Sequence, residues 1–597
     1  MKCIMIFSPR SEQFDDIYFS VEDGLAESRH VFLQQNDLPN RFQGKSRFTI
    51  CEAGFGTGLN FLCAWTLFEQ STRPNQQLDY ISFEKYPLSS ADILKYLAHW
   101  GSEFDGRLER LVELYPLRIG GWHRIRVSAQ VTLTLIFDDV NRALPQLDGA
   151  VDCWFLDGHA PAKNPDMWSD IIFSQMGRLS AAGARVSTFT AAGFVRRGLK
   201  NAGFQVSKVR GYGRKCDMTV GEFCGQGVLP VAIQYPGRVA VIGGGIAGAS
   251  LCSALARRGV LVDLYEKHEL ASGGSGNLRG LFNPRFTARL GDEADFYSSA
   301  FRHGLCEFSD LQTRHDVGLL PCGSLHIILD EDKLKRSEGF IQNWGWHKDH
   351  ARIVDRDEAR EISGVPLSYG ALFLPDAGMI SPKLVVEALA QSANIIMEEV
   401  GSLSKQGHVW IVNNREYDAV VLAGAHDVLK FPHVSWLPIH TVRGQVSLMD
   451  PPEIFSGLKT NLCHGGYASH PFDGTMVVGS TFKPWLDHLD VTEEDHVEVL
   501  QKLAVVVDGY DGVSLVKGGR AAFRCAANDR VPVIGCVPDW DGLYLSVAHG
   551  SHGLSTATLG AEIIVAQMAG ESPPVPRNVL KFLSAQRFID RKARKGS

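Results

Sequence analysis

The sequence predicts an α/β protein with two cofactor-binding domains in tandem. Two segments, one beginning near Phe48 and one at Arg238, each combine a strand, a glycine-rich turn, a helix and a second strand that ends in an acid. This order of elements is that of a doubly wound, Rossmann-like sheet. Such a unit usually opens its domain, yet the second one begins only at Arg238. The long stretch before it is therefore expected to form a domain of its own.

Bulk composition narrows the class of protein. A chain of 597 residues is too long for one hydrophobic core. Its net charge of −7 gives no general indication of a nucleic-acid partner, so any such site has to be a local patch. The 12 cysteines form no CxxC pair and no metal-type spacing, and no stretch is long and apolar enough for a signal peptide or a membrane span. We expect reduced thiols, no metal and a cytoplasmic location.

The first glycine loop follows an apolar strand over residues 48–53. Its glycines and the acid before them read E-x-G-x-G-x-G, without the wider spacing that cradles phosphates. A helix over 59–68 and a strand over 78–83 follow, and the strand ends at Glu84. This pattern resembles class I S-adenosylmethionine methyltransferases, and a second nucleotide-diphosphate domain is the alternative. The resemblance implies cofactor contacts from Glu52, Gly54, Gly56, Gly58 and Glu84.

Two later strands of this region also end in acids. The strand over 131–137 ends in Asp138 and Asp139, placed to meet an adenine amino group, and the strand over 151–156 ends at Asp157. Ligands of open α/β sheets collect at the carboxyl ends of the strands. Asp157, near Asn164, is therefore expected to orient an amine and to take its proton. The alternative is that Asp157 only caps the following turn. Strands over 184–189, 204–209 and 218–224, with a helix over 194–201, complete the sheet.

Four stretches of this first region resemble one enzyme family. They are YFSVEDGLAESRHVFL (18–33), CEAGFGTGLNFL (51–62), DGHAPAKNPDMW (157–168) and GYGRKCDM (211–218). They are similar to the bifunctional enzymes that make 5-methylaminomethyl-2-thiouridine at the wobble position of bacterial tRNA. The resemblance covers essentially the whole chain, and it implies a tRNA partner contacted by Lys163, Asn164, Tyr212, Arg214 and Lys215. Departures from the family pattern are His159, Tyr212 and Cys216.

The second glycine segment predicts a dinucleotide site. A strand over 239–242 leads into the loop 243–248, a helix over 249–258 follows, and the next strand ends at Glu266. The glycines allow the turn, the approach of a pyrophosphate and the packing of helix on strand, and the acid accepts the ribose hydroxyls. An acid there favours FAD or NAD over NADP. The contacts expected here are Gly243, Gly245, Gly248, Glu266 and Lys267.

The family resemblance implies that this second domain is an FAD-dependent oxidoreductase similar to glycine oxidases. We place a methyltransferase domain at 1–225, a linker at 226–237 and the oxidoreductase at 238–597. A Gly/Ser-rich loop at 271–277 is expected to wrap the cofactor, although such a loop can also be plain surface. A helix beginning near residue 553 is expected to aim its amides at the flavin. The further cofactor contacts are Ser272, Gly273, Asn277, Gly550, His552, Gly553 and Leu554.

Alternating segments at 445–448 and 476–479 predict an antiparallel substrate sheet. By resemblance, Arg524 holds the substrate carboxylate, for which a guanidinium fork is well suited. A solvated or structural arginine is the alternative. Further substrate contacts are expected from Arg443 and Tyr467.

The resemblance implies a coherent pair of reactions. The FAD domain oxidatively removes the carboxymethyl group of a 5-carboxymethylaminomethyluridine in tRNA, and the first domain methylates the resulting amine. Basic residues between Arg577 and Lys595 could add an RNA-facing patch, or they could simply be solvated. Two other functions fit the motifs alone. One is a small-molecule N-methyltransferase fused to a glycine or sarcosine-type amine oxidase, and the other is a binding protein that holds both cofactors without turnover.

Overall fold

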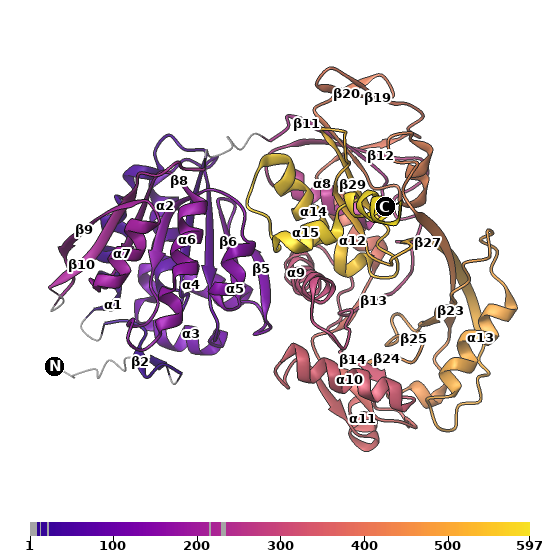
Figure 1. Ribbon diagram of the computed structural model, residues 1–597. Helices are drawn as coiled ribbons and strands as arrows, with labels where there is room; N and C mark the ends of the chain where they lie inside the picture. Colours follow the sequence, from indigo (N-terminus) through magenta and orange to yellow (C-terminus); the bar gives the residue numbers. More distant parts are fainter. Residues whose placement is uncertain (1–8, 12, 21–22, 214–215, 229–234, 597) are drawn as a thin grey trace. The chain divides into compact units, whose positions relative to one another are not determined.

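A computed structural model describes residues 9–11, 13–20, 23–213, 216–228 and 235–596, which form two compact units (Figure 1). The first unit comprises Met1–Gln234 together with Gly570–Arg577, and the second comprises Tyr235–Ala569 and Asn578–Ser597. The division at residues 234 and 235 lies inside the expected linker. Residues 570–577 differ from expectation, because the sequence assigns them to the second domain whereas their contacts lie in the first unit.

The first unit is built on one eight-stranded sheet of order β5-β6-β4-β3-β7-β8-β10-β9. Its middle strands β6, β4, β3, β7 and β8 are parallel, and β5, β10 and β9 run antiparallel to their neighbours. This confirms the doubly wound fold. The strands are β3 (Arg47–Ala53), β4 (Gln77–Phe83), β5 (Gly121–Arg126), β6 (Val131–Phe137), β7 (Val151–Leu156), β8 (Ser180–Thr188), β9 (Phe204–Arg210) and β10 (Asp217–Phe223).

Two separate apolar cores cover the two faces of this sheet. Alternate residues of the buried strands point to opposite faces, so Ile50 and Tyr80 join one core while Cys51 and Ile81 join the other. Helices α2 (Leu59–Ser71), α3 (Ser90–Leu97) and α4 (Arg107–Leu114) bury residues in the first core. Helices α5 (Val140–Ala143), α6 (Asp170–Leu179) and α7 (Gly193–Asn201) bury residues in the second. This arrangement leaves the carboxyl ends of the parallel strands free for a site.

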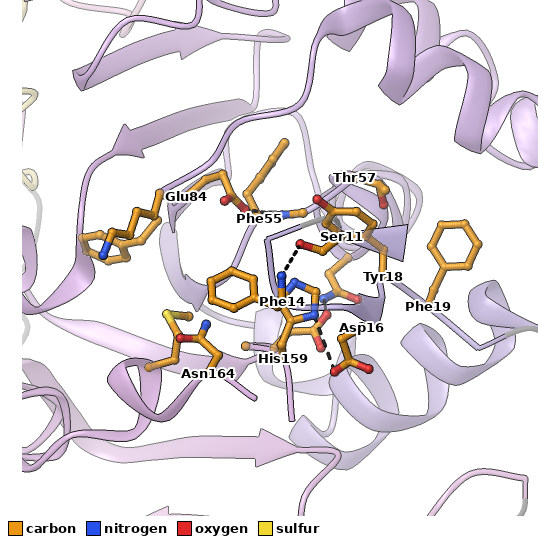
Figure 2. Close-up of a pocket in the computed structure, with 18 of the residues that line it drawn as sticks. Ser11, Phe14, Asp16, Tyr18, Phe19, Phe55, Thr57, Glu84, His159 and Asn164 are labelled. Atoms are coloured by element: carbon orange, nitrogen blue, oxygen red, sulfur yellow. Dashed lines mark hydrogen bonds and ion pairs between the residues drawn. The ribbon is translucent and has the colours of Figure 1, made fainter. Parts of the chain in front are cut away.

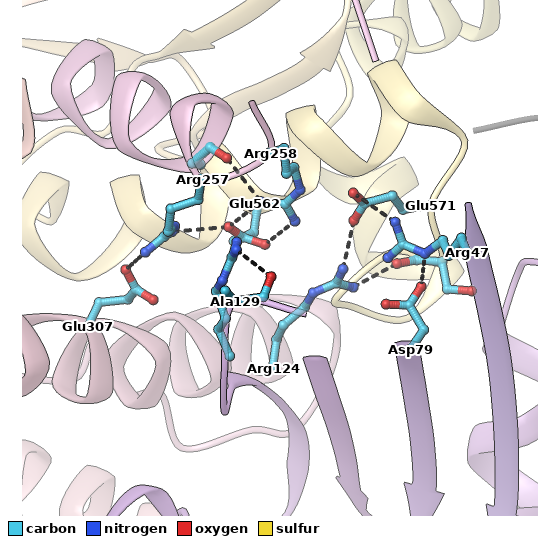
Figure 3. A network of polar contacts seen from close by, with 12 residues as sticks. Arg47, Asp79, Arg124, Ala129, Arg257, Arg258, Glu307, Glu562 and Glu571 are labelled. Atoms are coloured by element: carbon cyan, nitrogen blue, oxygen red, sulfur yellow. Dashed lines mark hydrogen bonds and ion pairs between the residues drawn. The ribbon is translucent and has the colours of Figure 1, made fainter. Parts of the chain in front are cut away.

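The segment Gly570–Arg577 completes the first unit through a buried ion-pair network (Figure 3). Glu571 accepts a hydrogen bond from Arg124 Nη2 at 2.7 Å and pairs with Arg47 Nη1 at 3.1 Å, and Arg124 also donates to the Ser572 carbonyl at 2.8 Å. The side chain of Glu571 is fully buried, and those of Arg47 and Arg124 are 8% and 3% exposed. These buried guanidinium groups explain why the segment lies with the first unit.

Replacing Glu571 by glutamine is expected to destabilise the first unit by about 3–5 kcal/mol, because it removes the negative charge between two buried cations. The measurement is unfolding in urea, followed by amide hydrogen exchange. The exchange rates of the β3 and β5 amides report the stability of the first unit separately from that of the second. Glu113→Gln is the matched control, since Glu113 is 59% exposed and pairs with Arg110 on the surface of α4. That change is expected to cost less than about 1 kcal/mol. Equal stability of the two variants would contradict the prediction.

The second unit contains a six-stranded, mostly parallel sheet of order β18-β12-β11-β22-β29-β28, in which only β28 is antiparallel. Helices α8 (Ile246–Ala256), α9 (Asp292–Arg314), α12 (Pro382–Ala390) and α14 (Gly553–Ala569) pack together beside it. The strands are β11 (Arg238–Ile242), β12 (Leu261–Glu266), β18 (Asn394–Met397), β22 (Ala419–Leu422), β28 (Val533–Cys536) and β29 (Leu543–Val547). The Rossmann-type part is confirmed.

A second, mixed sheet of eight strands has the order β15-β16-β14-β24-β25-β26-β23-β27. Its pairs are antiparallel except for β14 with β24, which confirms the expected antiparallel character of the sheet predicted to bind substrate. Helix α13 (Glu493–Ala504) lies against β23 and β26. The strands are β14 (Ser324–Ile327), β15 (Arg352–Val354), β16 (Ala371–Leu374), β23 (Ile439–Met449), β24 (Asn461–Cys463), β25 (Tyr467–Ala468), β26 (Met476–Gly479) and β27 (Val516–Ala527).

Smaller elements complete the described chain. A β1–β2 hairpin and helix α1 belong to the first unit, and the second unit also has a two-stranded sheet, a three-stranded sheet and further helices. Among the described residues, no helix is long and apolar enough to cross a membrane. These elements are β1 (Arg10–Ser11), β2 (Asp16–Ile17), α1 (Gly24–Ser28), β13 (Gly280–Phe282), β17 (Gly378–Ile380), β19 (Leu403–Gln406), β20 (Val409–Val412), β21 (Arg415–Tyr417), α10 (Glu331–Trp344), α11 (Arg356–Ser363), α15 (Arg577–Leu583) and α16 (Gln586–Gly596).

Two candidate active sites

The first unit has a cavity of about 490 Å³ at the carboxyl ends of its parallel strands (Figure 2). Several residues predicted from the sequence line it, although they come from distant parts of the unit's sequence. The loop after β3 contributes two glycines, and the segments after β4, β6 and β7 contribute acids. The predicted residues that line the cavity are Gly54, Gly56, Glu84, Asp138, Asp139, Asp157 and Asn164.

The glycine loop and Glu84 form the part of the cavity that suits a ribose. Gly54 has a φ of 99°, and a Cβ there would collide with the Asp157 carbonyl, so the close approach of the two segments requires glycine. Glu84 accepts hydrogen bonds from the backbone N–H of Gly56 at 2.9 Å and of Tyr86 at 2.8 Å. Burial raises the pKa of Glu84. A carboxylate held in this way can accept the hydroxyls of a bound nucleoside.

Asp138 and Asp139 also line the cavity, from the segment after β6. Arg142 Nε donates to both oxygens of Asp138 at 2.8 and 3.0 Å. Asp139 caps α5 by accepting from Asn141 N at 2.9 Å, and Lys85 Nζ donates to it at 2.8 Å. Against the effect of burial, the Lys85 ammonium and the Asn141 amides lower the pKa of Asp139. Both acids are therefore held in place as hydrogen-bond acceptors.

Asp157 is connected to a buried network through Asn60, a residue that the motifs do not single out. Asn60 Nδ2 donates to Asp157 Oδ2 at 2.7 Å and to Glu52 Oε1 at 2.9 Å, while Ser28 Oγ donates to Asn60 Oδ1 at 2.5 Å. The hydroxyl therefore fixes which way the amide faces, and both amide hydrogens are used by acids. Asn60 lines the cavity from the first turn of α2.

Glu52 does not lie where its predicted role as a cofactor contact requires. Its side chain is buried beneath the cavity without lining it, and Ser82 Oγ donates to Glu52 Oε2 at 2.7 Å. Burial raises the pKa of Glu52 to about 8, and the charge of Asp157 adds to this shift. Glu52 is therefore mainly protonated at neutral pH, so it does not add a second negative charge beside Asp157.

The other residues predicted for this unit do not line the cavity or are not described. Gly58, with a φ of 81°, begins α2. Lys163 Nζ donates to the Asp15 carbonyl and to Asp16 Oδ1 instead. The Tyr212 ring lies 5.9 Å from the His30 ring. Arg214 and Lys215 lie outside the described residues.

An aromatic wall lines one side of the cavity, formed by Phe14 and Tyr18 before α1 and by His159 after β7 (Figure 2). The His159 ring lies 4.9 Å from the Phe14 ring and 5.6 Å from the Tyr18 ring, and His159 Nδ1 is 3.7 Å from the Asp16 carboxylate. Burial lowers the pKa of His159 against the opposing charge of Asp16. His159 is thus a neutral, planar ring at neutral pH, and it can pack against a ligand as an aromatic residue would.

The second candidate site starts at the turn between β11 and α8. Gly243 has a φ of 118°, and a Cβ there would lie 2.7 Å from the backbone of Ala423 and Gly424. A Cβ at Gly248 would collide with the Gly243 carbonyl, so helix and strand pack only because both residues are glycines. Gly245 is the N-cap of α8, whose amides point at the space a pyrophosphate takes in such folds. The residues present fit a dinucleotide.

Glu266 and a serine in the following loop complete this turn. Glu266 Oε2 accepts from Gly244 N at 2.8 Å, at the place where a ribose is expected. Ser275 Oγ accepts from Ile246 N at 3.0 Å, and so it satisfies an amide at the N-terminus of α8. Lys267 points elsewhere, because its Nζ pairs with Asp427 at 2.5 Å. The ammonium of Lys267 is thus engaged in an ion pair, and its contact with a cofactor stays a prediction.

Arg520, on β27, holds the loop over residues 271–277 in place. It donates to Asn277 Oδ1 at 3.0 Å and to the Ser272 carbonyl at 2.8 Å, and it also bonds to the Gly273 carbonyl. The predicted residues of this loop are thus brought together by one guanidinium. Sequence motifs did not identify Ser275 or Arg520, since each acts on a segment that is distant from it in the chain.

The segment before α14 lies close to the same turn. Gly550 has a φ of 59°, and a Cβ at Gly553 would lie 3.2 Å from Ile246. Leu554 meets Gly280, where a Cβ would lie 2.6 Å from the leucine side chain. Burial lowers the pKa of His552 to about 4, so its ring is neutral. The amino end of α14 therefore lies beside that of α8.

Arg524 lies on β27 of the substrate sheet. Its guanidinium donates to the Thr481 carbonyl at 3.3 Å and to Ser480 Oγ, and it fills the space beside Gly444, where any Cβ would collide with it. Burial lowers the pKa of Arg524, and the nearby Tyr467 hydroxyl opposes this. Tyr467 donates to the Arg279 carbonyl at 3.3 Å, and burial raises its pKa to about 12. A half-buried fork beside a neutral hydroxyl suits a carboxylate.

Arg443 does not fit its predicted role in substrate binding. Its side chain is fully buried, and it donates to Asp495 on α13, to Gln445 Oε1 at 3.0 Å and to the Asp490 carbonyl. Alternation along β23 explains the difference, since Arg443 and Gly444 must point to opposite faces. Arg443 therefore ties α13 to the sheet, whereas Arg524 occupies the other face.

Comparisons with known proteins agree with this division. Residues 102–223 match the family model described as S-adenosyl-L-methionine-dependent methyltransferase, and residues 238–567 match that described as FAD dependent oxidoreductase. Among solved structures, the glycine oxidase of Geobacillus kaustophilus is 20% identical with a TM-score of 0.51, and it covers 59% of this chain and 99% of its own. The L-proline dehydrogenase of P. horikoshii is 18% identical with a TM-score of 0.52, covering 60% and 98%. These two likenesses show the fold of the second unit.

Relatives of nearly full length are also similar. A protein of Stutzerimonas stutzeri is 37% identical over 99% of this chain and 97% of its own length, and one of Methylobacillus flagellatus is 38% identical over 98% and 95%. Both are named tRNA 5-methylaminomethyl-2-thiouridine biosynthesis bifunctional protein MnmC. The likeness therefore spans both units.

Proposed function

The chain belongs to the family of tRNA 5-methylaminomethyl-2-thiouridine biosynthesis bifunctional proteins, and on this premise we propose that it modifies the wobble uridine of tRNA in two successive steps. The chain is an FAD-dependent oxidoreductase and an S-adenosylmethionine-dependent methyltransferase. A tRNA substrate also supports the cytoplasmic location expected from the sequence. In the first step the carboxymethyl group of 5-carboxymethylaminomethyluridine is removed, and in the second the amine is methylated.

One observation carries this proposal beyond the family name. The second unit holds a guanidinium fork suited to a carboxylate, and the first holds a carboxylate suited to an amine. Oxidation of the C–N bond next to the substrate carboxylate, followed by addition of water, releases glyoxylate and leaves a primary amine. That amine is a methyl acceptor, so the product of one site is the substrate of the other.

The oxidoreductase residues act by holding the substrate. Arg524 binds the carboxylate with two parallel N–H donors, which sets both its position and its plane. Tyr467 is neutral, and its hydroxyl can donate to the same group by giving up its 3.3 Å hydrogen bond to the Arg279 carbonyl. FAD, held by the turn at Gly243–Gly248 and by Glu266, supplies a two-electron acceptor at this site. Fixing the carboxylate places the adjacent C–H bond in one orientation.

The methyltransferase residues act on the amine. Asp157 accepts the proton that the amine must lose as it is methylated, and Asn60 holds that carboxylate with one oxygen engaged at 2.7 Å. S-adenosylmethionine, held by Gly54, Gly56 and Glu84, supplies the methyl group. Because Glu52 is mainly protonated, it adds little repulsion to the Asp157 carboxylate. Asn60 is thus a positioning residue, and Asp157 is the proposed general base.

Nucleoside mass spectrometry tests the proposed function directly. Purified protein is incubated with tRNA that carries the carboxymethylaminomethyl group, with and without S-adenosylmethionine. We expect the aminomethyl nucleoside without S-adenosylmethionine and the methylaminomethyl nucleoside with it. An unchanged nucleoside from flavin-loaded protein would reject the tRNA reaction, and oxidation of free sarcosine or glycine would then indicate a small-molecule amine oxidase.

A further inference from the structure

An exposed phenylalanine lies on the oxidoreductase substrate sheet and has no part in the roles given above. Phe482 is 62% exposed, although its neighbour Thr481 is fully buried. The chain after β26 continues alongside β23, because Thr481 N donates to the Gln445 carbonyl at 3.1 Å and Lys483 N donates to the Arg443 carbonyl at 2.9 Å. Residues 481–483 are therefore extended, with side chains that alternate between the two faces.

Contacts with α13 determine which face Phe482 occupies. Arg443 and Lys483 both pair with Asp495 on α13, and Gln445 Nε2 donates to the Thr492 carbonyl at its N-cap at 2.8 Å. These side chains therefore point to the α13 face of the sheet. Phe482, between Thr481 and Lys483, points to the opposite face. Gly444 faces the same way, and the Arg524 guanidinium lies against it.

Phe482 lies two residues after Ser480, the residue whose hydroxyl contacts Arg524. Ser480 Oγ accepts from Arg524, and Phe482 follows two positions later, about 6–7 Å along an extended chain. In a carboxymethylaminomethyluridine, four single bonds of about 1.5 Å separate the carboxylate carbon from the ring, so the ring begins about 5 Å from the carboxylate. A substrate held by Arg524 can therefore bring its planar ring over Phe482.

We propose that Phe482 is the platform on which the uracil of the wobble nucleotide stacks while Arg524 holds its carboxylate. The inference rests on the proposed tRNA function and extends it to recognition of the base. Single exposed apolar residues are common on protein surfaces, but this one shares a face and a spacing with the carboxylate site. An aromatic ring stacks on a base without needing any particular hydrogen-bonding pattern. Arg524 thus recognises the carboxylate of the substrate, and Phe482 supports the planar base without distinguishing one base from another.

The test compares four variants at this position in the full-length, flavin-loaded protein. Phe482→Ala and Phe482→Leu are expected to raise the KM for the modified tRNA about 10- to 100-fold, the range found for loss of a base–aromatic stack. Phe482→Tyr and Phe482→Trp are expected to stay within about 3-fold of wild type. A leucine variant with the wild-type KM would overturn the proposal, because it would show that the size of the side chain matters and not its planar ring. An alanine variant that behaves like wild type would also overturn it.

Controls separate this inference from the proposed function. Leu515→Ala removes a side chain that is 75% exposed just before β27, far along that strand from Arg524, and is expected to leave the KM unchanged. Binding of a modified anticodon stem–loop, measured by fluorescence anisotropy, gives a second readout and should weaken in parallel with KM. If the wild-type protein does not oxidise the tRNA, the proposed function fails. If the wild type does so and the alanine variant matches it, only the stacking inference fails.

Discussion

Replacing Arg524 by alanine is expected to lower kcat/KM for oxidation of the carboxymethylaminomethyl group by roughly 10²- to 10³-fold, the loss typical of a desolvated charge pair that loses one partner. The substrate carboxylate would then face Ser480, Thr481 and Tyr467 without a cation. Arg524→Lys is expected to recover only part of the activity, because an ammonium keeps the charge but cannot donate two parallel hydrogen bonds in one plane. Stopped-flow reduction of the flavin by modified tRNA measures this step.

Two measurements show whether the Arg524→Ala protein loses activity only because it is misfolded or lacks flavin. The flavin content should be unchanged, since Arg524 bonds to Ser480 and Thr481 and not to the turn at Gly243–Gly248. Methylation of tRNA that already carries the aminomethyl group should also be unchanged, because that reaction belongs to the first unit. An alanine variant that oxidises the tRNA at the wild-type rate would reject Arg524 as the carboxylate-binding residue.

Replacing Asp157 by asparagine is expected to reduce methyl transfer by about 10²- to 10⁴-fold, the usual contribution of a positioned general base. The amide has the shape of the carboxylate and can still accept from Asn60, but it cannot take a proton at neutral pH. Oxidation should continue, so the aminomethyl nucleoside should accumulate when S-adenosylmethionine is present. Mass spectrometry of the tRNA nucleosides measures both amounts in one sample.

A paired variant distinguishes a base from a residue that only shapes the cavity. Asn60→Ala leaves Asp157 in place but removes its 2.7 Å hydrogen bond, so kcat should fall while the affinity for S-adenosylmethionine changes little. Because Asn60 acts through Asp157, it should add little further loss to the Asp157→Asn protein. Fully additive losses would contradict this coupling, and a fully active Asp157→Asn protein would reject the base itself.

Local patterns were sufficient to predict the parts of both sites that depend on backbone shape. The glycines of the two turns and the acids at the strand ends, such as Glu84 and Glu266, act close to their own strands. The doubly wound topology then brings the ends of β3, β4, β6 and β7 to one edge, which is why residues from Gly54 to Asn164 meet at one cavity.

The missed or misassigned residues depend on contacts between distant segments. Asn60 looks like an ordinary helix residue until its partners Ser28, Glu52 and Asp157 are placed around it. Glu52 stands in the motif but faces inward beneath the cavity. Arg443 precedes a glycine next to the predicted substrate sheet, and only the packing of α13 shows which face of β23 it occupies. No short pattern carries this information, because each of these environments is made by another part of the fold.

The buried ion pairs of Glu571 with Arg47 and Arg124 have a consequence for the order in which the parts of the protein fold. Domains usually fold as they leave the ribosome, the amino-terminal one first. Here the first unit reaches its full complement of charges only when Glu571 has been synthesised, long after the rest of that unit. Until then Arg47 keeps its ion pair with Asp79 of the same unit, and the ion pairs of Glu571 with Arg47 and Arg124 form only after the oxidoreductase strands have been translated. A chain released early would contain all the methyltransferase motifs and still lack the acid that pairs with these two buried arginines.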